Sequence, residues 1–261
     1  MKAIVLGCGP SAGVPQLGES YPPGMLEDPR NHRTRASILV EHAGTQILVD
    51  TSPDLRQQLL RHQVSRLDAV CFSHAHADHC HGIDDLRRIC RIMDSAIPAY
   101  ANGPCIDELE QRFGYVFEPN DPRYGWYAPQ LLAHRVATEP FRVGPVTVTP
   151  FAQDHVVMET LGFRFDAAGS SLAYSTDLKD LDDRGFEVVA GIDLWIVDCQ
   201  NLTENPIHSD LERTLGWIER ARPRRAVLTH MSQDMIWSAV EAMTPGHVTP
   251  AWDGMEIVLE A

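Results

Sequence analysis

The chain has 261 residues, of which 44% are hydrophobic and 22% are charged, a balance that favours a packed core and excludes a disordered or fibrous protein. Lysine and arginine number 22 against 36 aspartate and glutamate residues, so the formal net charge is −14. A protein that follows a phosphate backbone normally carries basic clusters, so this charge disfavours a nucleic-acid polymer and favours a small substrate.

The N-terminal apolar run, Met1 to Leu6, is too short for the core of a signal peptide and leads into a turn. No stretch approaches the roughly 20 apolar residues of a membrane span. The six cysteines are scattered, without the close spacing of a disulfide framework. We therefore expect a reduced cytoplasmic protein that does not act at a membrane, with one domain over residues 1–261.

Short runs rich in β-branched residues alternate with turn signals along the chain. They predict strands at Lys2–Leu6, Ala36–Val40, Thr45–Val49, Asp68–Phe72, Ile97–Tyr100, Val146–Phe151, Gly162–Phe165, Leu172–Tyr174, Leu194–Val197, Ala226–Thr229 and Glu256–Leu259. Helical patterns lie between them, which indicates two sheets covered by helices on their outer faces.

Three apolar patterns with helical spacing predict helices. The first opens at Ser52-Pro53, with the serine as cap and the proline in the first position. The second follows Gly82, and the third is marked by Leu211, Leu215 and Ile218. The segment Gly114–Gln130 is rich in aromatic residues and proline without periodicity. Two interpretations of this segment stay open, a surface loop or a lid over an active site.

A dense group of metal-binding side chains follows the strand at Asp68–Phe72, in the segment SHAHADH at residues 73–79. Residues two apart in extended backbone point the same way, which brings His74 and His76 together. Asp78 and His79, at the turn into the next helix, then face a neighbouring position. Three imidazoles and one carboxylate in this short segment suit zinc or another transition metal.

This HxHxDH motif is the signature of the metallo-β-lactamase superfamily, and the chain resembles that superfamily over nearly its whole length. Further residues of the family pattern follow in order at or just after the ends of predicted strands, namely Asp50, His155, Asp177 and His230. The resemblance implies an α/β protein with the αββα four-layer sandwich of two mixed β-sheets and outer helices.

The resemblance also implies two divalent metal ions, zinc or manganese with iron as a further option. The ligands that it implies are His74, His76 and His155 for the first ion, Asp78, His79 and His230 for the second, and Asp177 as a bridge. Asp50 is expected to orient a ligand imidazole rather than to bind metal. Such a pair of ions would activate a hydroxide that attacks the substrate.

One further histidine narrows the reaction. His208 precedes His230 by 22 residues, and the phosphodiesterase branch of the superfamily uses a non-ligand histidine there to protonate the leaving alkoxide or to stabilise charge on phosphate. We therefore expect Asp78 and His208 to be the catalytic residues, with a surface histidine at a helix entry as the other interpretation of His208. Glu204 and Asp198 are both candidates to orient it.

Within that branch the chain is similar to the phosphoribosyl 1,2-cyclic phosphate phosphodiesterase family, in residues 7–15, 50–56, 79–87, 228–232 and 252–255. Members of that family carry a cysteine-rich structural zinc clip after the first glycine loop. Residues 16–28 contain no cysteine, and Gln233 stands where the histidine of the clip is expected. We expect no structural metal there, and a small cyclic or nucleotide-like phosphodiester as substrate.

Other functions stay open at this stage. Pyrroloquinoline quinone biosynthesis protein B shares the glycine loop and the segment Ser52–Arg56, although that family usually departs from an intact HxHxDH motif. A tRNA 3′-processing endonuclease would need a long basic arm, which this acidic sequence does not show. A non-catalytic binding module would not need the complete ligand set. A homodimer is also an open option.

Overall fold

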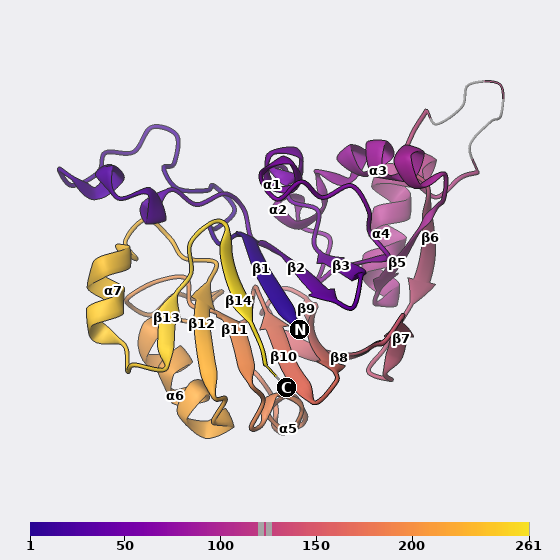
Figure 1. Ribbon diagram of the computed structural model, residues 1–261. Helices are drawn as coiled ribbons and strands as arrows, with labels where there is room; N and C mark the ends of the chain where they lie inside the picture. The colour runs from indigo at the N-terminus through magenta and orange to yellow at the C-terminus, as the bar shows by residue number, and fades with distance from the viewer. Residues whose placement is uncertain (120–122, 124–126, 261) are drawn as a thin grey trace.

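The computed structural model describes residues 1–119, 123 and 127–260. The chain forms two seven-stranded β-sheets that pack face to face, with helices on their outer faces (Figure 1). The strand order is β14-β1-β2-β3-β4-β5-β6 in the first sheet and β13-β12-β11-β10-β9-β8-β7 in the second. This arrangement confirms the predicted α/β class and the αββα sandwich.

Helices α1 to α4 cover the first sheet, and α5 to α7 cover the second (Figure 1). The strands of the first sheet are β1 (Lys2–Gly7), β2 (Ser37–His42), β3 (Thr45–Val49), β4 (Ala69–Cys71), β5 (Ile97–Ala101), β6 (Leu131–Arg135) and β14 (Met255–Val258). The strands of the second are β7 (Phe141–Val143), β8 (Val146–Asp154), β9 (Glu159–Ala167), β10 (Ser170–Ser175), β11 (Leu194–Asp198), β12 (Arg225–Thr229) and β13 (Val248–Pro250). The helices are α1 (Leu55–Arg61), α2 (Ala77–Cys80), α3 (Leu86–Met93), α4 (Gly103–Phe113), α5 (Asp183–Val189), α6 (Leu211–Ala221) and α7 (Trp237–Met243).

Both sheets repeat one pairing pattern. Strands β14, β1, β2 and β3 are antiparallel, as are β7, β8, β9 and β10. From β3 to β6, and from β10 to β13, the neighbours are parallel. Parallel neighbours need crossover connections, which here contain the helices. The carboxyl ends of the parallel strands therefore lie at one edge of each sheet, where ligand sites commonly form.

The alternation of side chains along each strand divides the core in two. In β1, Ala3 and Val5 face the other sheet and pack with residues such as Phe163, whereas Ile4 and Leu6 lie in a second core under the helices. All of these side chains are almost fully buried. Each sheet is thus apolar on both faces, as a middle layer must be.

Two helix starts differ from the predictions. The helix predicted to open at Ser52-Pro53 begins at Leu55, because Ser52 closes a turn with its carbonyl bonded to the Leu55 amide at 2.9 Å. The cap assigned to Ser52 is therefore wrong. The helix expected after Gly82 begins at Leu86, behind a 3₁₀ turn over Ile83–Asp85. A four-residue helix that was not predicted, α2, carries the second half of the HxHxDH motif.

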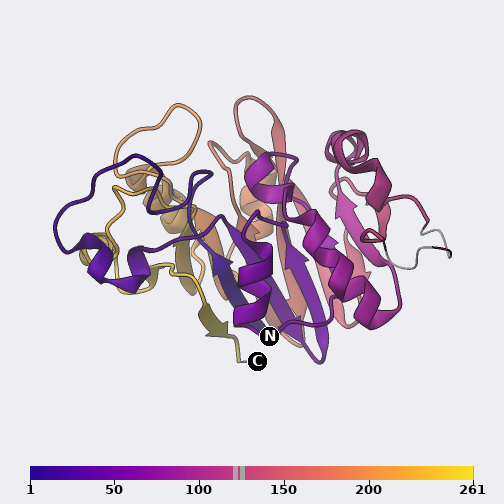
Figure 2. The ribbon, with the colours of Figure 1, turned by 90° about the horizontal axis from the view of Figure 1, so that it is seen from above.

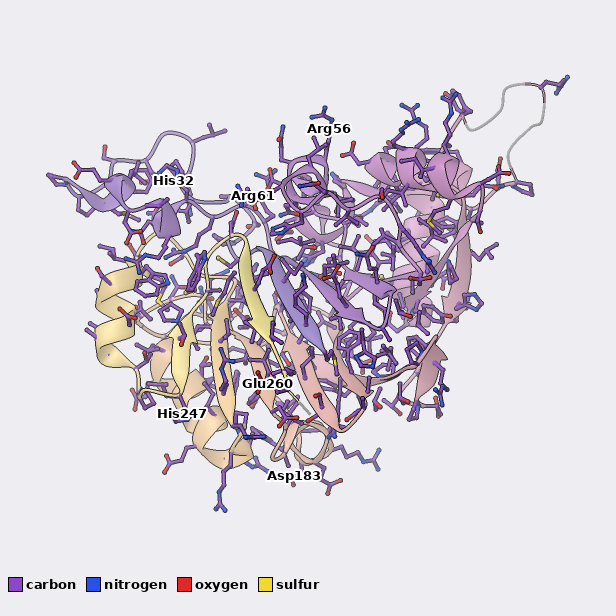
Figure 3. All side chains as sticks on the ribbon, viewed as in Figure 1. His32, Arg56, Arg61, Asp183, His247 and Glu260 are labelled. Carbon is purple, nitrogen blue, oxygen red and sulfur yellow. The ribbon has the colours of Figure 1, made fainter. Side chains whose placement is uncertain are left out.

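Strands β6, β7 and β13 and helices α4, α5 and α7 were not predicted, whereas the third predicted helix is α6, which confirms that prediction. Part of the segment Gly114–Gln130, residues 120–122 and 124–126, lies outside the described residues, so a lid there stays a prediction. Charged side chains such as Arg56 on α1 and Asp183 on α5 point away from the sheets (Figure 3). In the described part of the chain, no helix has the length and apolar character needed to cross a bilayer.

Candidate metal centre

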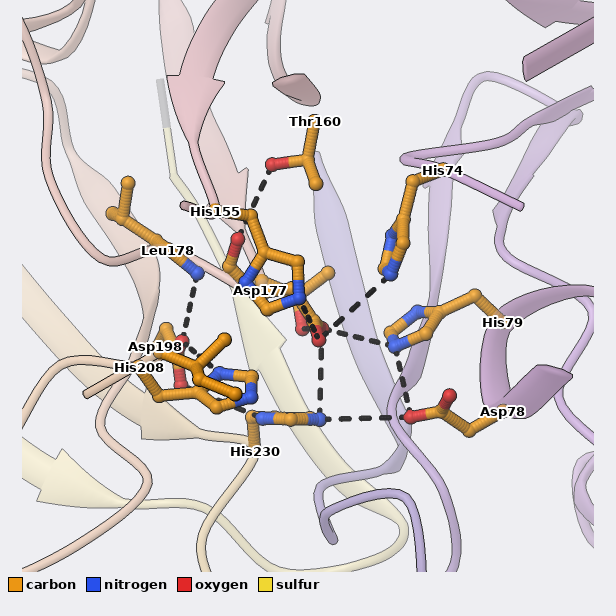
Figure 4. Close-up of polar contacts among 12 residues, drawn as sticks. His74, Asp78, His79, His155, Thr160, Asp177, Leu178, Asp198, His208 and His230 are labelled. Atoms are coloured by element: carbon orange, nitrogen blue, oxygen red, sulfur yellow. Dashed lines mark hydrogen bonds and ion pairs between the residues drawn. The ribbon is translucent and has the colours of Figure 1, made fainter. Parts of the chain in front are cut away.

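Figure 2 shows the ribbon of the two sheets from above. The predicted site residues meet where the carboxyl ends of strands from both sheets approach one another, and Figure 4 draws their polar contacts. Asp50 follows β3, and the HxHxDH motif follows β4. Asp177 lies just beyond β10, His230 follows β12, and His155 sits at the turn between β8 and β9. The two halves of the molecule therefore contribute to one centre.

Three of these residues leave their strands in the left-handed region of backbone conformation. The φ angles are 65° at Asp50, 50° at Asp177 and 58° at His230. This region is sparsely populated by residues other than glycine, and each such residue costs about 1–3 kcal/mol. Strained backbone of this kind clusters at functional sites.

The first group of donors contains His74, His76, His155 and Asp177, whose ligand atoms all lie within 4.8 Å of one another. The Nε2 atoms of His74 and His155 lie 3.8 Å and 3.7 Å from Oδ1 of Asp177. Three imidazole nitrogens and one carboxylate oxygen match a common zinc or manganese environment. The predicted ligands of the first ion are thus close enough to share one cation.

The second group contains Asp78, His79, Asp177 and His230, again with ligand atoms within 4.8 Å of one another. Here the contacts are to the other oxygen of Asp177, with Oδ2 2.9 Å from His79 Nε2 and 3.5 Å from His230 Nε2 (Figure 4). Asp78 Oδ2 lies 3.2 Å from His79 Nε2. Because each oxygen of Asp177 faces a different group, its geometry is that of a bridging carboxylate.

Buried atoms without partners test whether a cation fits. The Nε2 atom of His74 is buried and makes no hydrogen bond, and Oδ1 of Asp177 is 3.8 Å away. The Nε2 atoms of His79 and His230 are also buried, and they contact Oδ2 of Asp177 without the alignment of a hydrogen bond. Buried polar atoms are nearly always satisfied, so three such nitrogens directed at one carboxylate point to a ligand that completes the site. The donor set therefore fits a pair of divalent cations.

The electrostatics of the centre favour positive charge. Burial lowers the pKa of His79, but the nearby Asp177, Asp78 and Asp50 outweigh it and raise that pKa well above the usual value. For His230 burial again acts downward, and Asp177 and Asp198 raise the pKa to about 10. These carboxylates stabilise a proton on the imidazoles for the same reason that they would stabilise a metal ion.

Asp50 is fully buried and contacts the motif on the side away from the two groups of donors. Its Oδ2 lies 2.8 Å from Nδ1 of His79, and it accepts hydrogen bonds of 2.8 Å from the amide and hydroxyl of Ser73. The carboxylate thus fixes the His79 ring with Nε2 directed at the centre. The role of Ser73 was not visible in the sequence.

Because Gly82 has no side chain, the short helix α2 packs closely against the segment that follows Asp50. Its amide donates to the Thr51 carbonyl at 2.9 Å, and the Thr51 amide donates to the carbonyl of His79 at 2.8 Å. A Cβ at Gly82 would lie 1.9 Å from the carbonyl oxygen of Ser52, so no larger residue allows this approach.

His208 also reaches the centre, next to both groups of donors. Its ring centroid lies 4.9 Å from that of His155 and 4.8 Å from that of His230. Its Nδ1 lies 3.1 Å from Oδ2 of Asp198, which also accepts a 2.8 Å hydrogen bond from the Leu178 amide (Figure 4). Between the two acids left open by the sequence, the structure selects Asp198, and Glu204 is exposed to solvent.

Asp198 has a larger part than the sequence indicated. It ends β11 at the same edge as the predicted ligands, and its Oδ1 lies 3.6 Å from Nδ1 of His230. Burial raises its pKa, but His208 and His230 outweigh that and lower it, so this carboxylate stays charged. Like Asp50 and His230, which the family pattern indicated, Asp198 lies at a strand end, and this position is the signal in the sequence that points to it.

The segment where the related family carries its zinc clip is held by other contacts. The guanidinium of Arg30 lies 3.6 Å from the centre of the Trp237 ring. Asn31 donates from Nδ2 to the Met25 carbonyl at 2.9 Å and accepts at Oδ1 from the Trp237 amide at 2.8 Å. Residues 25–31 are thus fastened to α7 by aromatic and amide contacts.

A family model described as the β-lactamase superfamily domain matches residues 45–231, more than two thirds of the chain. A curated relative named octanoyltransferase, from Porphyromonas gingivalis, is 33% identical over 264 residues and matches all of this chain. The chain spans 52% of the length of that relative, so its name describes a protein about twice as long.

Solved structures extend the comparison. A diphosphatase from the PhnP family is 32% identical with a TM-score of 0.88, and the match covers 98% of this chain and 97% of that one. Zinc-bound PqqB from Methylobacterium extorquens is 21% identical with a TM-score of 0.73, covers 99% and 100% of the two chains, and shares the fold. The chain therefore belongs to the metallo-β-lactamase superfamily, in the branch that contains the PhnP family, and carries the clustered histidines and aspartates of a metal-binding site.

Proposed function

We propose that this protein is a hydrolase, a phosphodiesterase with two divalent metal ions, and that its substrate is a small cyclic or nucleotide-like phosphodiester. The observation that carries the proposal is the His208–Asp198 pair, a positioned acid beside two groups of metal donors that contributes to neither. Hydrolysis of an alkyl phosphodiester needs both parts, a place for the phosphate and a proton for the departing oxygen.

The two groups of donors described above would each hold one ion, with zinc or manganese as the preferred metals and iron as a further option. Bound there, such ions would lower the pKa of a coordinated water and neutralise charge on the phosphate. Asp177 would supply one oxygen to each ion, because its two oxygens face different groups. Asp50 would keep the His79 ring oriented through its contact with Nδ1, so that Nε2 faces the ion.

Asp78 is the member of the second group with the most exposed side chain, at 12% against 0–4% for His79, Asp177 and His230. It is therefore the carboxylate in that group that reaches the substrate side. We assign it a second role beside metal binding, which is to accept a hydrogen bond from the attacking water and orient it.

His208 would donate its proton to the leaving oxygen. Asp198 keeps the imidazole oriented, since the 3.1 Å contact joins Nδ1 to a buried carboxylate. An alkoxide is a strongly basic leaving group and depends on such a proton, whereas a leaving phosphate is far less basic. The solved PhnP relative is named a diphosphatase, so a diphosphate is the second candidate substrate, and the acid favours the phosphodiester.

The test compares leaving groups. For wild-type protein loaded with zinc or manganese we expect turnover of 2′,3′-cyclic nucleotides and bis(p-nitrophenyl) phosphate. His208→Ala should lower kcat for the cyclic nucleotide by ~10²–10⁴-fold, and much less for the nitrophenyl ester, whose leaving group needs no proton. Metal content should not change. His247→Ala, an exposed histidine far from the centre (Figure 3), is the matched control.

Several results would contradict the proposal. Turnover of only a diphosphate, a thioester or a β-lactam would move the function to another branch of the superfamily. Cleavage of a precursor tRNA at its 3′ end would favour the processing endonuclease, contrary to our expectation of no polymer substrate. Loss of metal from His208→Ala would make that histidine a ligand.

A further inference from the structure

We propose that a cavity on the His208 side of the centre binds the heterocyclic base of a nucleotide-like leaving group. The inference rests on the proposed phosphodiesterase function and adds a substrate class to it. The cavity has a volume of about 410 Å³, and its walls include Tyr21, Met25, Leu202, Thr203, Gln233 and Ile236. This volume lies in the range of small-molecule sites. We call it the base cavity.

One wall of the base cavity and the proposed acid belong to the same hydrogen-bonded loop, residues 200–208. Asn205 organises that loop, because its Oδ1 accepts from the amides of Ile207 at 2.8 Å and His208 at 3.1 Å. Its Nδ2 donates to Gln200 at 2.8 Å and to Asn201 at 2.7 Å. The loop therefore presents His208 near one end and Leu202 and Thr203 near the other.

The opposite wall of the base cavity is formed by residues that come shortly after His230, a proposed metal ligand, in the chain. The amide of Ser232 donates to the Gln200 carbonyl at 2.9 Å, and its hydroxyl accepts from Asn201 at 3.1 Å. Gln233, the next residue, lines the cavity, and Gln200 itself lies 3.4 Å from Nδ1 of His230. The base cavity thus lies on the side of the centre from which His208 would protonate the departing oxygen.

The chemistry of the walls suits a flat heterocycle with a polar edge. Met25, Leu202 and Ile236 offer apolar surface, and Tyr21 offers an aromatic face for stacking. The Oε1 atom of Gln233 is buried and has no hydrogen-bond partner, so a ligand that donates a hydrogen bond would satisfy this acceptor. An exocyclic amino group, as on adenine, supplies that donor, whereas an unsubstituted purine linked to ribose has neither an amino group nor a ring N–H.

The negative charge of its walls excludes the other large cavity near the centre as a binding site for the substrate. That cavity, of about 440 Å³ beside His155, is lined by four carboxylates, Asp154, Glu159, Asp180 and Asp182, and by no basic residue. An anionic phosphodiester is repelled there. The base cavity has one carboxylate, Asp234, among its walls. Its outer wall is also preformed, because Asn31 binds the Met25 carbonyl and the Trp237 amide.

The test uses a substrate with a base and one without. In 2′,3′-cyclic AMP the leaving oxygen remains on the sugar that carries the base, whereas methyl p-nitrophenyl phosphate has no base and no N–H group that can donate to Gln233. Gln233→Leu removes the acceptor at similar size. We expect the KM for 2′,3′-cyclic AMP to rise about 5–10-fold through loss of one hydrogen bond, with kcat within about twofold and no change for the base-free ester. Gln57→Leu, an exposed glutamine on α1, is the control.

The outcomes separate this inference from the proposed function. If wild-type protein cleaves neither ester, the phosphodiesterase proposal itself fails. If it cleaves both but Gln233→Leu changes both equally or neither, only the base cavity is refuted. Equal kcat/KM in the wild type for 2′,3′-cyclic AMP and for the 2′,3′-cyclic phosphate of purine riboside would also refute it, because the two differ only in the amino group that should donate to Gln233.

Discussion

Replacement of Asp198 by alanine isolates the residue that orients the proposed acid. Asp198 is fully buried, and its Oδ2 serves both the His208 ring, at 3.1 Å, and the Leu178 amide, at 2.8 Å. Alanine leaves both donors without a partner. The variant should therefore lose rate and stability by separate amounts, each of which follows from one contact.

A hydrogen bond to a charged group contributes about 1.5–3 kcal/mol. If the whole of the His208 contact acts in the transition state, kcat falls by about 10–10²-fold. The unsatisfied Leu178 amide costs a further 1–3 kcal/mol or so of folding free energy. For a chain of this size that corresponds to a fall in Tm of roughly 3–10 °C.

The assay measures kcat for 2′,3′-cyclic AMP at saturating metal, with Tm from thermal unfolding. Saturating metal is needed because Asp198 Oδ1 also lies 3.6 Å from His230 Nδ1. Glu204→Ala removes the other acid that the sequence offered, and its exposed side chain predicts an unchanged rate. An unchanged rate for Asp198→Ala, or equal losses for both variants, would refute this account of the acid.

Four further expectations follow from the same geometry. Asp177→Ala should weaken binding at both metal positions, because its two oxygens face different groups, and elemental analysis that shows loss of one metal alone would contradict a bridge. Asn205→Ala should lower kcat about tenfold for alkoxide leaving groups without loss of metal, since it removes the anchor of the His208 amide. Removal of bound metal by a chelator should lower Tm by about 5–10 °C, and added zinc or manganese should restore it. A Tm that does not change with chelator would argue against a metal-filled site. All six cysteines are free and buried, and burial raises the pKa of Cys80 to about 11, so a thiol reagent at pH 8 should label no more than about one thiol until denaturant is added.

The sequence predicted best the features that depend on local pattern. The alternation of apolar residues identified the central strands, and β3 was predicted with its observed ends, Thr45–Val49. Strand β6 was missed because four of its five residues are exposed, so the apolar alternation of a buried strand is absent. Strand β13 has three residues and ends in a proline, which local propensity disfavours.

The site likewise contains residues that the sequence pattern predicted and contacts that it could not predict. The residues of the motif and of the strand ends meet as predicted, because the carboxyl ends of parallel strands share an edge. Asp198 and Glu204 could not be separated, since only the path of the loop between them decides which acid faces His208. The Asn205 network likewise joins atoms whose contacts arise only after the loop has folded.

The left-handed backbone of Asp50, Asp177 and His230 has a consequence for protein engineering. Glycine would relax each of these positions, so a library screened for heat resistance alone should drift toward it and lose the side chains that gather the cations. At these three positions thermal stability and activity favour different residues. A screen that measures turnover together with Tm should therefore retain all three side chains.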